Sequence, residues 1–265
     1  LDFTPNPKGG IDSLSNKAIA DIRAAAGMGK AYMPDDVKSA LEGQEISQKI
    51  YNLLSLYDDY NQNEYNPSLN ELGNLFGEGT RDNAIDKLKN SRYKNVLTQA
   101  EATAIYSYTG SGYAYFNDFL RDLDKQLNTL SQIEPSDKEL YDQTYAKIVN
   151  TLKHGKRKVK QVFLMLQGLA KMMADDKKHN RHRARLFTRG ANYIMPNKEK
   201  DIMYDSGFTS VANSASQEGW YSKKGQYAFY TKQAVDITGL SGFGGTEREY
   251  LVFPGTQFML DKAFQ

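Results

Sequence analysis

The sequence contains no cysteine, which excludes disulfide bonds, thiolate zinc sites and cysteine nucleophiles. Histidine is scarce as well: His154, His179 and His182 lie in stretches rich in lysine and arginine, which disfavours a histidine metal site or a Ser-His-Asp triad. No apolar run reaches about 18 residues, so we expect no transmembrane helix, and the first residues lack the basic-then-apolar order of a signal peptide. The chemistry must come from carboxylates, arginines, hydroxyls and aromatic rings.

Neither sign of charge dominates. In 265 residues, 34 lysines and arginines nearly balance 32 aspartates and glutamates, giving a formal net charge of +2. This balance disfavours an acidic disordered tail and a histone-like nucleic-acid binder. The hydrophobic fraction of 40% is enough to bury a core in one large domain or two. The 18 tyrosines suit ligand stacking, but they suit ordinary packing equally well.

The first two-thirds of the chain has the pattern of helices. Apolar residues at three- and four-residue spacing predict helices near 15–26 and over 36–57, the second starting after Pro34. The polar, turn-rich segment 61–70 predicts a loop. We therefore expect a helical N-terminal region.

Two capping patterns and one apolar stripe predict the helices that follow. Thr98 and Glu101 have the spacing of a capping box and open a helix toward Tyr106. A similar pattern at Ser136-Asp137-Lys138-Glu139 predicts a helix over 136–152. Segment 159–173 carries its apolar residues on one stripe, as a buried helix does.

The pattern changes after Arg183. Segments 184–188, 207–212, 226–232 and 249–254 are short, rich in aromatic or β-branched residues, and separated by turn residues. Helices followed by a mainly antiparallel sheet region predict an α+β fold.

Two glutamates flank Arg248 directly before an apolar run. If Glu249 begins a strand, side chains alternate and Glu247 projects to the same side, roughly 7 Å away. Two such carboxylates can divide their work, one stabilising a cationic transition state and the other activating a nucleophile. Taken alone, the pattern is equally typical of a solvated strand end.

Three further features are ambiguous when taken singly. Phe243, in the glycine-rich loop 242–246, suits partner recognition or a plain hairpin turn. Arg189-Gly190, at the end of a predicted strand, could grip a diphosphate, although a lone arginine is more often a surface residue. A buried Ser210 hydroxyl would need a partner, and a carboxylate would serve.

Two other motifs do not support the functions that they suggest at first. The segment 27–30 is similar to a phosphate loop, but Ala24 and Ala31 stand where that motif needs glycine and serine or threonine. The basic run 177–183 could touch phosphates, but a charged connector between a helix and a strand is usually only solvated. Nucleic-acid binding is therefore the weaker hypothesis.

Taken together, the ordered motifs are more specific. Arg189, Ser210 and the Glu247–Glu249 pair occur in this order, with spacings of 21 and 39 residues from Arg189 to Ser210 to Glu249. This arrangement resembles the Arg–Ser–Glu-x-Glu signature of mono-ADP-ribosyltransferases, a family that includes bacterial toxins and effectors.

Two more stretches are similar to the same family. Tyr108-Thr109-Gly110-Ser111-Gly112-Tyr113, with Phe116-Asn117 and Leu120-Arg121, resembles the helix that opens its catalytic domain. Segments 236–241 and 249–258 resemble its closing strands, so the resemblance covers about residues 90–265. The family's middle motif is commonly Ser-Thr-Ser, whereas Val211 and Ala212 follow Ser210 here.

The resemblance implies an architecture and a co-substrate. It implies a catalytic domain over 86–265 built on a split antiparallel sheet, whereas the helical region over 1–85, a segment for targeting, docking or packing, has no counterpart that we can assign in the family. NAD⁺ would lie in a cleft between the sheet and the preceding helices, and no metal is implied. The implied NAD⁺ contacts are Arg189, Gly190, Tyr108, Tyr113, Asn117 and Phe208.

The resemblance also implies the catalytic roles. Glu249 would stabilise the ribosyl cation left after nicotinamide departs, and Ser210 would orient Glu249. Glu247 would orient and deprotonate the acceptor, because this form of the signature generally implies arginine, which is always protonated in water. Arg189 would hold the phosphates of NAD⁺, and Phe243 would touch the target protein.

The implied setting is a toxin or effector that is secreted or delivered into the cytosol of a host cell, where actin or a small GTPase is a family-level guess for the target. Two alternatives stay open. The first is an NAD⁺ glycohydrolase, in which water replaces the protein acceptor. The second is a non-enzymatic helical protein that binds an acidic partner through the basic segment 177–185. Labelled NAD⁺ added to a cell lysate would separate transfer from hydrolysis.

Overall fold

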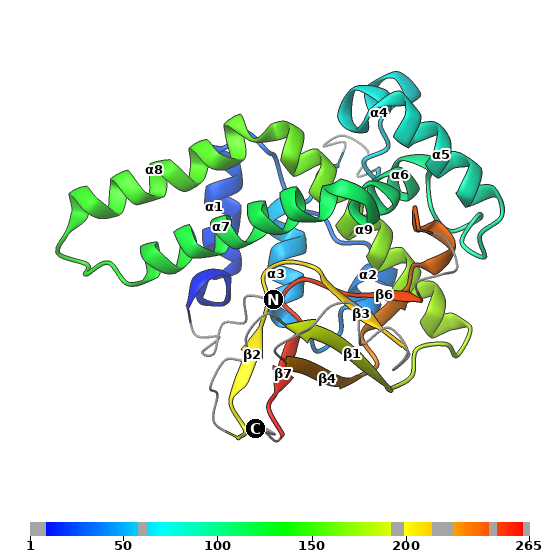
Figure 1. The fold of residues 1–265 in the computed structure, drawn as a ribbon. Coiled ribbons are helices and arrows are strands. Elements are labelled where there is room, and N and C mark those ends of the chain that lie inside the picture. Colours follow the sequence, from blue (N-terminus) through cyan, green and yellow to red (C-terminus); the bar gives the residue numbers. More distant parts are fainter. Residues whose placement is uncertain (1–8, 58–62, 192–198, 214–224, 244–247, 262–265) are drawn as a thin grey trace.

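The computed structural model describes residues 9–57, 63–191, 199–213, 225–243 and 248–261. Helices form one layer, and the strands gather beneath it (Figure 1). This order, helices first and then an antiparallel sheet region, confirms the predicted α+β fold.

The N-terminal helices differ in part from the prediction. The described part of this region contains η1 (Gly10–Ser13), α1 (Asn16–Ala25), α2 (Asp35–Ala40), α3 (Glu45–Leu54), α4 (Leu69–Phe76) and α5 (Glu78–Lys89). The single helix predicted over 36–57 is wrong, because the chain turns at Gly43, whose φ of 76° favours glycine. The predicted loop 61–70 ends early, since Ser68 caps α4 by accepting from the Glu71 amide.

The central helices largely agree with the prediction. They are α6 (Gln99–Ser107), the π-helical turn η2 (Tyr108–Gly112), α7 (Tyr113–Ser131), α8 (Lys138–His154) and α9 (Lys156–Lys178). The capping box is confirmed: the Glu101 amide donates to Thr98 Oγ1 at 3.2 Å, and the Thr98 amide donates to Glu101 Oε1 at 2.7 Å. The cap of α8 is Asp137 rather than Ser136, because its carboxylate accepts from the Leu140 amide.

The described strands form two antiparallel sheets. One contains β1 (Arg185–Ala191), β3 (Thr209–Ala212), β4 (Gly225–Thr231), β5 (Ala234–Asp236) and β6 (Glu249–Val252), in the order β4-β1-β3-β6-β5. The other pairs β2 (Ile202–Tyr204) with β7 (Gln257–Met259). The strand order differs from the sequence order, so β1, β3 and β6 are neighbours although they are distant in the chain.

The main hydrophobic core joins the helices to residues of β2, β5 and β6. Its buried side chains run from Ile11 in η1 to Phe253 just after β6. A small second cluster lies within the sheet region and contains Phe187, Met203, Val211, Phe229, Tyr250 and Val252. Helix α3 also contacts the turn after β6 directly, because Ser47 Oγ donates to the Pro254 carbonyl at 2.8 Å. At Gly255, an added Cβ would lie 2.5 Å from Ile46 Cγ2. The domain boundary expected near residue 85 stays a prediction.

A buried arginine organises the turn after α1. Arg23 is 0% exposed and donates to backbone carbonyls on two sides. Its acceptors are the carbonyl oxygens of Met28, Gly29, Lys30, Asn52, Leu53 and Ser55. Segment 27–30 thus directs carbonyl oxygens at a cation, whereas a phosphate loop directs amides at an anion. The rejected phosphate-loop motif has a structural role instead.

Candidate active site

A serine and a glutamate meet on two neighbouring strands. Ser210 on β3 lies opposite Leu251, and Ala212 lies opposite Glu249 on β6, so Ser210 and Glu249 are diagonal neighbours on one face of the sheet. Ser210 Oγ donates a hydrogen bond to Glu249 Oε1 at 2.7 Å. Both side chains are half-buried. A charge-assisted bond of this length fixes the direction of the carboxylate while part of it stays exposed.

An arginine approaches the same pair from the other side of β3. Arg189 on β1 donates from Nη1 to the Ser210 carbonyl oxygen at 2.6 Å. Its Nε atom is shielded from solvent and has no hydrogen-bond partner among the described residues. Such an unsatisfied buried donor is uncommon in folded proteins. Because β1, β3 and β6 are adjacent, a cation, a hydroxyl and a carboxylate stand on three consecutive strands.

Tyr108 and Asn117 hold the start of β3. The Asn117 side-chain amide pairs with the backbone of Phe208: Nδ2 donates to the carbonyl at 3.2 Å, and Oδ1 accepts from the amide at 2.8 Å. The Tyr108 hydroxyl donates to the same carbonyl at 3.3 Å. Burial raises the pKa of Tyr108, and the charges of Arg189 and Glu249 act on it in opposite directions.

The two predicted NAD⁺-contacting tyrosines have different surroundings. Tyr108 is 3% exposed, with its ring packed against Tyr113, Phe116 and Phe208 at centroid distances of 6.5, 6.2 and 5.5 Å. Tyr113 is 55% exposed. Tyr113 thus offers a ring surface, whereas Tyr108 supports the strand beneath. A direct contact between either ring and NAD⁺ stays a prediction.

A polar stripe runs along α7, and the sequence analysis named its members Asn117 and Arg121 but not Asp124. Asn117, Arg121 and Asp124 stand at helical spacing, and each binds the segment that leads into β3. Arg121 donates from Nε and Nη2 to the two carboxylate oxygens of Asp205, at 3.0 and 2.9 Å. Asp124 Oδ2 accepts from Ser206 Oγ at 2.6 Å. The spacing along α7 could have revealed its half of the stripe, but nothing in the sequence marks the partners of these side chains.

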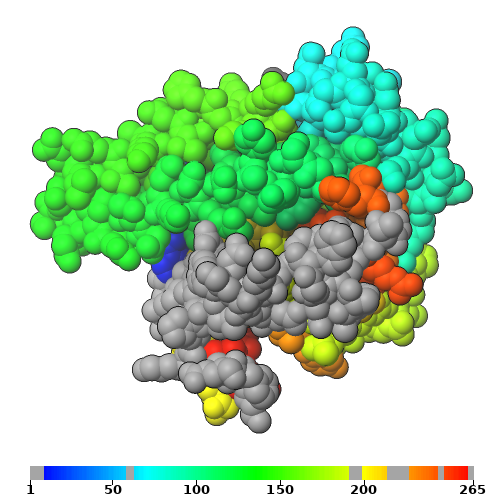
Figure 2. Space-filling view, viewed as in Figure 1, coloured from blue at the N-terminus to red at the C-terminus, as the bar shows by residue number. Residues whose placement is uncertain are grey.

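The remaining predicted site residues lie at the edges. Phe243 is 57% exposed, in the loop between η4 (Thr238–Leu240) and β6. In the space-filling view, the segment ending at residue 243 (orange) lies against the helical layer (green) (Figure 2). Gly190 pairs with Gln226 of β4. Glu247 falls outside the described residues, so its placement beside Glu249 stays a prediction.

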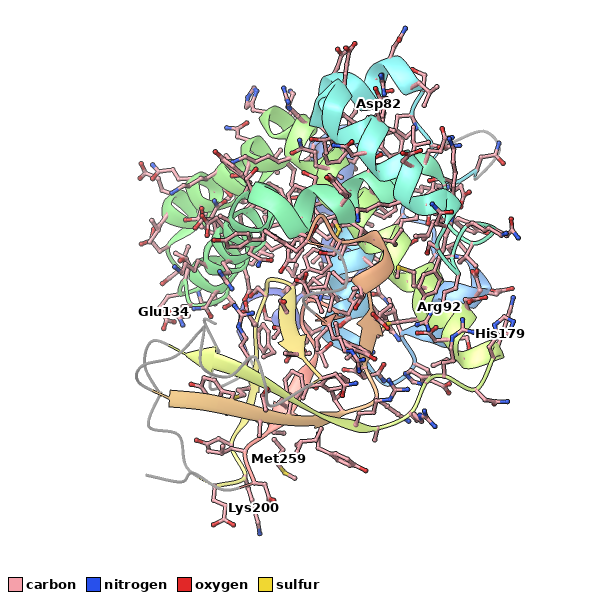
Figure 3. All side chains as sticks on the ribbon, turned by 45° about the vertical axis from the view of Figure 1, so that its right-hand side comes forward. Asp82, Arg92, Glu134, His179, Lys200 and Met259 are labelled. Atoms are coloured by element: carbon pink, nitrogen blue, oxygen red, sulfur yellow. The ribbon has the colours of Figure 1, made fainter. Side chains whose placement is uncertain are left out.

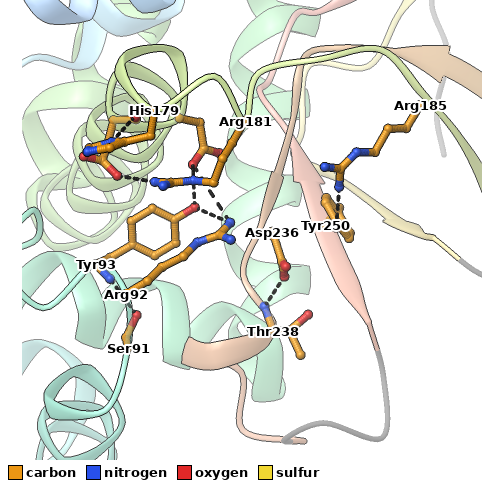
Figure 4. Close-up of polar contacts among 11 residues, drawn as sticks. Ser91, Arg92, Tyr93, His179, Arg181, Arg185, Asp236, Thr238 and Tyr250 are labelled. Atoms are coloured by element: carbon orange, nitrogen blue, oxygen red, sulfur yellow. Dashed lines mark hydrogen bonds and ion pairs between the residues drawn. The ribbon is translucent and has the colours of Figure 1, made fainter.

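The basic connector after α9 is largely engaged in internal contacts. Arg181 Nε donates to Asp176 Oδ1 at 2.9 Å, and its Nη2 contacts Asp175 (Figure 4). Tyr93, in the turn before α6, donates to Asp176 at 3.0 Å, and Arg92 donates to the Tyr93 hydroxyl. Arg92 and the connector accordingly lie on the same side of the molecule (Figure 3). Arg181 therefore holds the connector to the helical layer.

Within the described residues, no group of three or more histidine, cysteine, aspartate or glutamate side chains is placed to hold a metal ion. The same residues contain no helix that is both long enough and apolar enough to cross a membrane.

No protein-family model matches the sequence, and no curated protein matches it. Solved structures do. The type III effector XopAI from Xanthomonas axonopodis pv. citri is 13% identical, with 92% of each chain covered and a TM-score of 0.51. The eukaryotic mono-ADP-ribosyltransferase ART2.2 is 15% identical, covering 91% of this chain and 88% of its own, with a TM-score of 0.46. Exoenzyme S from Pseudomonas aeruginosa, solved with human 14-3-3 protein beta and carba-NAD, is 13% identical, covering 72% and 79%, with a TM-score of 0.42. The likeness to XopAI shows that the two proteins share a fold.

Proposed function

We propose that the protein is an NAD⁺-dependent mono-ADP-ribosyltransferase that modifies an arginine side chain of a target protein. The observation that supports this most is the hydrogen bond from Ser210 to Glu249, with Arg189 bonded to the Ser210 backbone. These residue types were singled out by a sequence resemblance, and in the fold they stand on three adjacent strands. Neither the local sequence pattern nor the composition requires these three residues to stand on adjacent strands.

We assign Glu249 to the first half of the reaction. The bond between the nicotinamide nitrogen and C1 of its ribose breaks, and the electron pair leaves with neutral nicotinamide. Positive charge develops on the sugar, and a fixed carboxylate stabilises that charge more strongly in the transition state than in the ground state. The hydroxyl of Ser210 fixes the orientation of the Glu249 carboxylate, so little reorganisation is needed when positive charge develops on the sugar.

Arg189 is suited to the phosphates of NAD⁺. A guanidinium offers a planar fork of N–H donors that matches phosphate oxygens. One donor of Arg189 is bonded to the Ser210 carbonyl, which fixes the side chain beside the proposed catalytic carboxylate. Apart from the shielded Nε, the remaining N–H groups can donate hydrogen bonds to an anionic ligand. Gly190, next along β1, would permit a close approach to the backbone.

The second half of the reaction needs a base. The acceptor nitrogen forms a bond to C1 and releases a proton, which we assign to Glu247. An arginine acceptor makes this role necessary, because its guanidinium is otherwise protonated and a poor nucleophile. Exposed Phe243, a few residues earlier in the same loop, would contact the target protein.

The fold shared with XopAI also favours a biological setting. XopAI is described as a type III effector, so we propose that this protein likewise acts after delivery into a host cell. Actin and small GTPases stay predictions for the target.

Labelled NAD⁺ incubated with the protein and a host-cell lysate tests this function. We expect labelled protein bands and released nicotinamide, with mass spectrometry locating ADP-ribose on arginine. Glu249→Gln should lower both reactions by about 10²–10³-fold, as loss of one charge-stabilising group does in other enzymes. Glu134→Gln, an exposed glutamate far along the helical layer (Figure 3), is the matched control and should be fully active. Release of free ADP-ribose without labelled protein would favour a glycohydrolase, and full activity in Glu249→Gln would contradict the assignment.

A further inference from the structure

Thr109 makes a contact that the proposed mechanism does not use. It lies in η2, the π-helical turn between α6 and α7, and its side chain is 6% exposed. Its hydroxyl donates to the Tyr106 carbonyl at 2.7 Å and accepts the Gly242 amide at 2.9 Å. A buried hydroxyl that both donates and accepts is fully satisfied and therefore well fixed.

The partner of Thr109 is the base of the loop that leads toward the candidate site. Ser241 is 0% exposed, whereas Phe243 is 57% exposed, so the chain leaves the core at Gly242. A Cβ added to Gly242 would lie 3.6 Å from the Tyr106 ring and 3.7 Å from Thr109 Oγ1. The point where the chain emerges is thus held between a ring and a hydroxyl of the same helical segment.

The backbone of η2 is shaped for this contact. Gly110 departs from helical geometry, with φ of −86° and ψ of −116°. A Cβ on Gly112 would lie 2.6 Å from the Ser107 carbonyl oxygen, so only glycine fits there. Single π-helical turns of this kind occur frequently at functional sites, because they shift the side chains that follow. Here the turn presents Tyr108 toward Phe208 and the adjacent Thr109 toward Gly242.

From these contacts we infer that Thr109 is a positioning residue that sets Gly242, and with it the adjacent Phe243, against the helical wall of the proposed NAD⁺ cleft. This inference rests on the proposed function. The loop is fixed at Gly242 by Thr109 and at Glu249 by Ser210. Loss of the first bond leaves the Glu249 carboxylate in place but frees the end that carries Phe243. Thr109 therefore governs transfer to the acceptor protein more than cleavage of NAD⁺.

Thr109→Val, with Thr109→Ser as the matched control, tests this role. Valine keeps the shape of the side chain but removes both hydrogen bonds, and serine keeps the hydroxyl. Thr109→Val should lower protein labelling about tenfold, because the buried Gly242 amide loses its acceptor, and raise KM for the acceptor protein. NAD⁺ hydrolysis and KM for NAD⁺ should stay within about twofold, as for a substitution outside the reacting groups. Thr109→Ser should label protein at nearly the wild-type level, because it keeps the hydroxyl.

An independent measurement separates this inference from the proposed function. Amide hydrogen exchange at Gly242 should quicken in Thr109→Val while exchange at Leu251 in β6 stays unchanged. Equal loss of labelling and hydrolysis, or an unchanged ratio of the two, would overturn the role of Thr109 even if the enzyme is active. A wild-type protein that neither cleaves NAD⁺ nor labels protein would overturn the proposed function, and with it this role, whatever the exchange at Gly242 shows.

Discussion

Two glutamates of this protein are each held by hydrogen bonds, yet their surroundings are opposite. Glu101, at the start of α6, is 0% exposed and accepts bonds from the Thr98 amide, from Gln167 and from Lys171. Glu249, at the start of β6, is half-buried and accepts a bond from Ser210. One carboxylate is enclosed by the helical layer, and the other stands at the start of an inner strand of the sheet.

The difference indicates which carboxylate can act on a ligand. Burial raises the pKa of Glu101, while the charge of Lys171 and the surrounding hydrogen bonds oppose that rise. Both of its oxygens are engaged, so this group stabilises a helix junction and cannot meet a substrate. Glu249 is directed by a hydroxyl from a neighbouring strand and is still partly accessible, which is what electrostatic stabilisation of a transition state requires.

The largest effect that tests this contrast is on stability. Glu101→Gln removes the fully buried partner of Lys171 but leaves Glu64 as its second partner, so we expect a cost near the lower end of the range of about 3–5 kcal/mol for breaking a buried ion pair. Glu249→Gln should change the free energy of unfolding by less than about 1 kcal/mol, because its side chain is half-buried. Urea unfolding of the two variants and wild type measures both values. If Glu249→Gln is the more destabilised protein, the contrast between the two carboxylates is wrong.

A smaller effect concerns how the helical layer supports β6. Gly255 follows β6 with φ of 77°, and a Cβ there would strike Ile46 of α3 at 2.5 Å. Gly43 has a similar φ of 76° with nothing within 4 Å, so it separates backbone strain from the clash. Gly255→Ala should lower the free energy of unfolding by about 2–4 kcal/mol, strain and overpacking together, and Gly43→Ala by about 1–2 kcal/mol. Thermal unfolding measures both, and equal losses would show that α3 yields to the added methyl.

The sequence predicted what local physics decides. The capping box at Thr98 and the apolar stripe of α9 depend on residues within a few positions, and both helices form as expected. The break between α2 and α3 was missed, because a continuous apolar spacing conceals the turn at Gly43. Helix α5 was missed as well, since Ala84 and Leu88 are its buried residues and leave little apolar pattern.

The candidate site depends on pairings that no local pattern contains. The resemblance named Arg189, Ser210 and Glu249, but the order β1-β3-β6 that joins them comes from tertiary structure. The α7 stripe is a similar case. Arg121 belongs to the sequence stretch that resembles the family's first catalytic helix. Its partner Asp205 lies 84 residues away in a loop without any recognisable pattern. Polar partners this far apart in the chain can be identified only from the three-dimensional structure.

The smallest expected effect isolates the hydroxyl that distinguishes Glu249 from Glu101. Ser210→Ala removes a hydrogen bond to a charged group, worth about 1.5–3 kcal/mol, so we expect NAD⁺ cleavage to fall about 10–100-fold. Ser210→Thr keeps the hydroxyl and should retain more activity than the alanine variant. The readout is kcat for nicotinamide release together with KM for NAD⁺. A loss confined to kcat indicates that the hydroxyl aims Glu249 at the transition state, because ground-state binding is then untouched. A rise in KM alone would instead mean that Ser210 helps to bind NAD⁺, and the two glutamates would then differ in exposure but not in preorganisation.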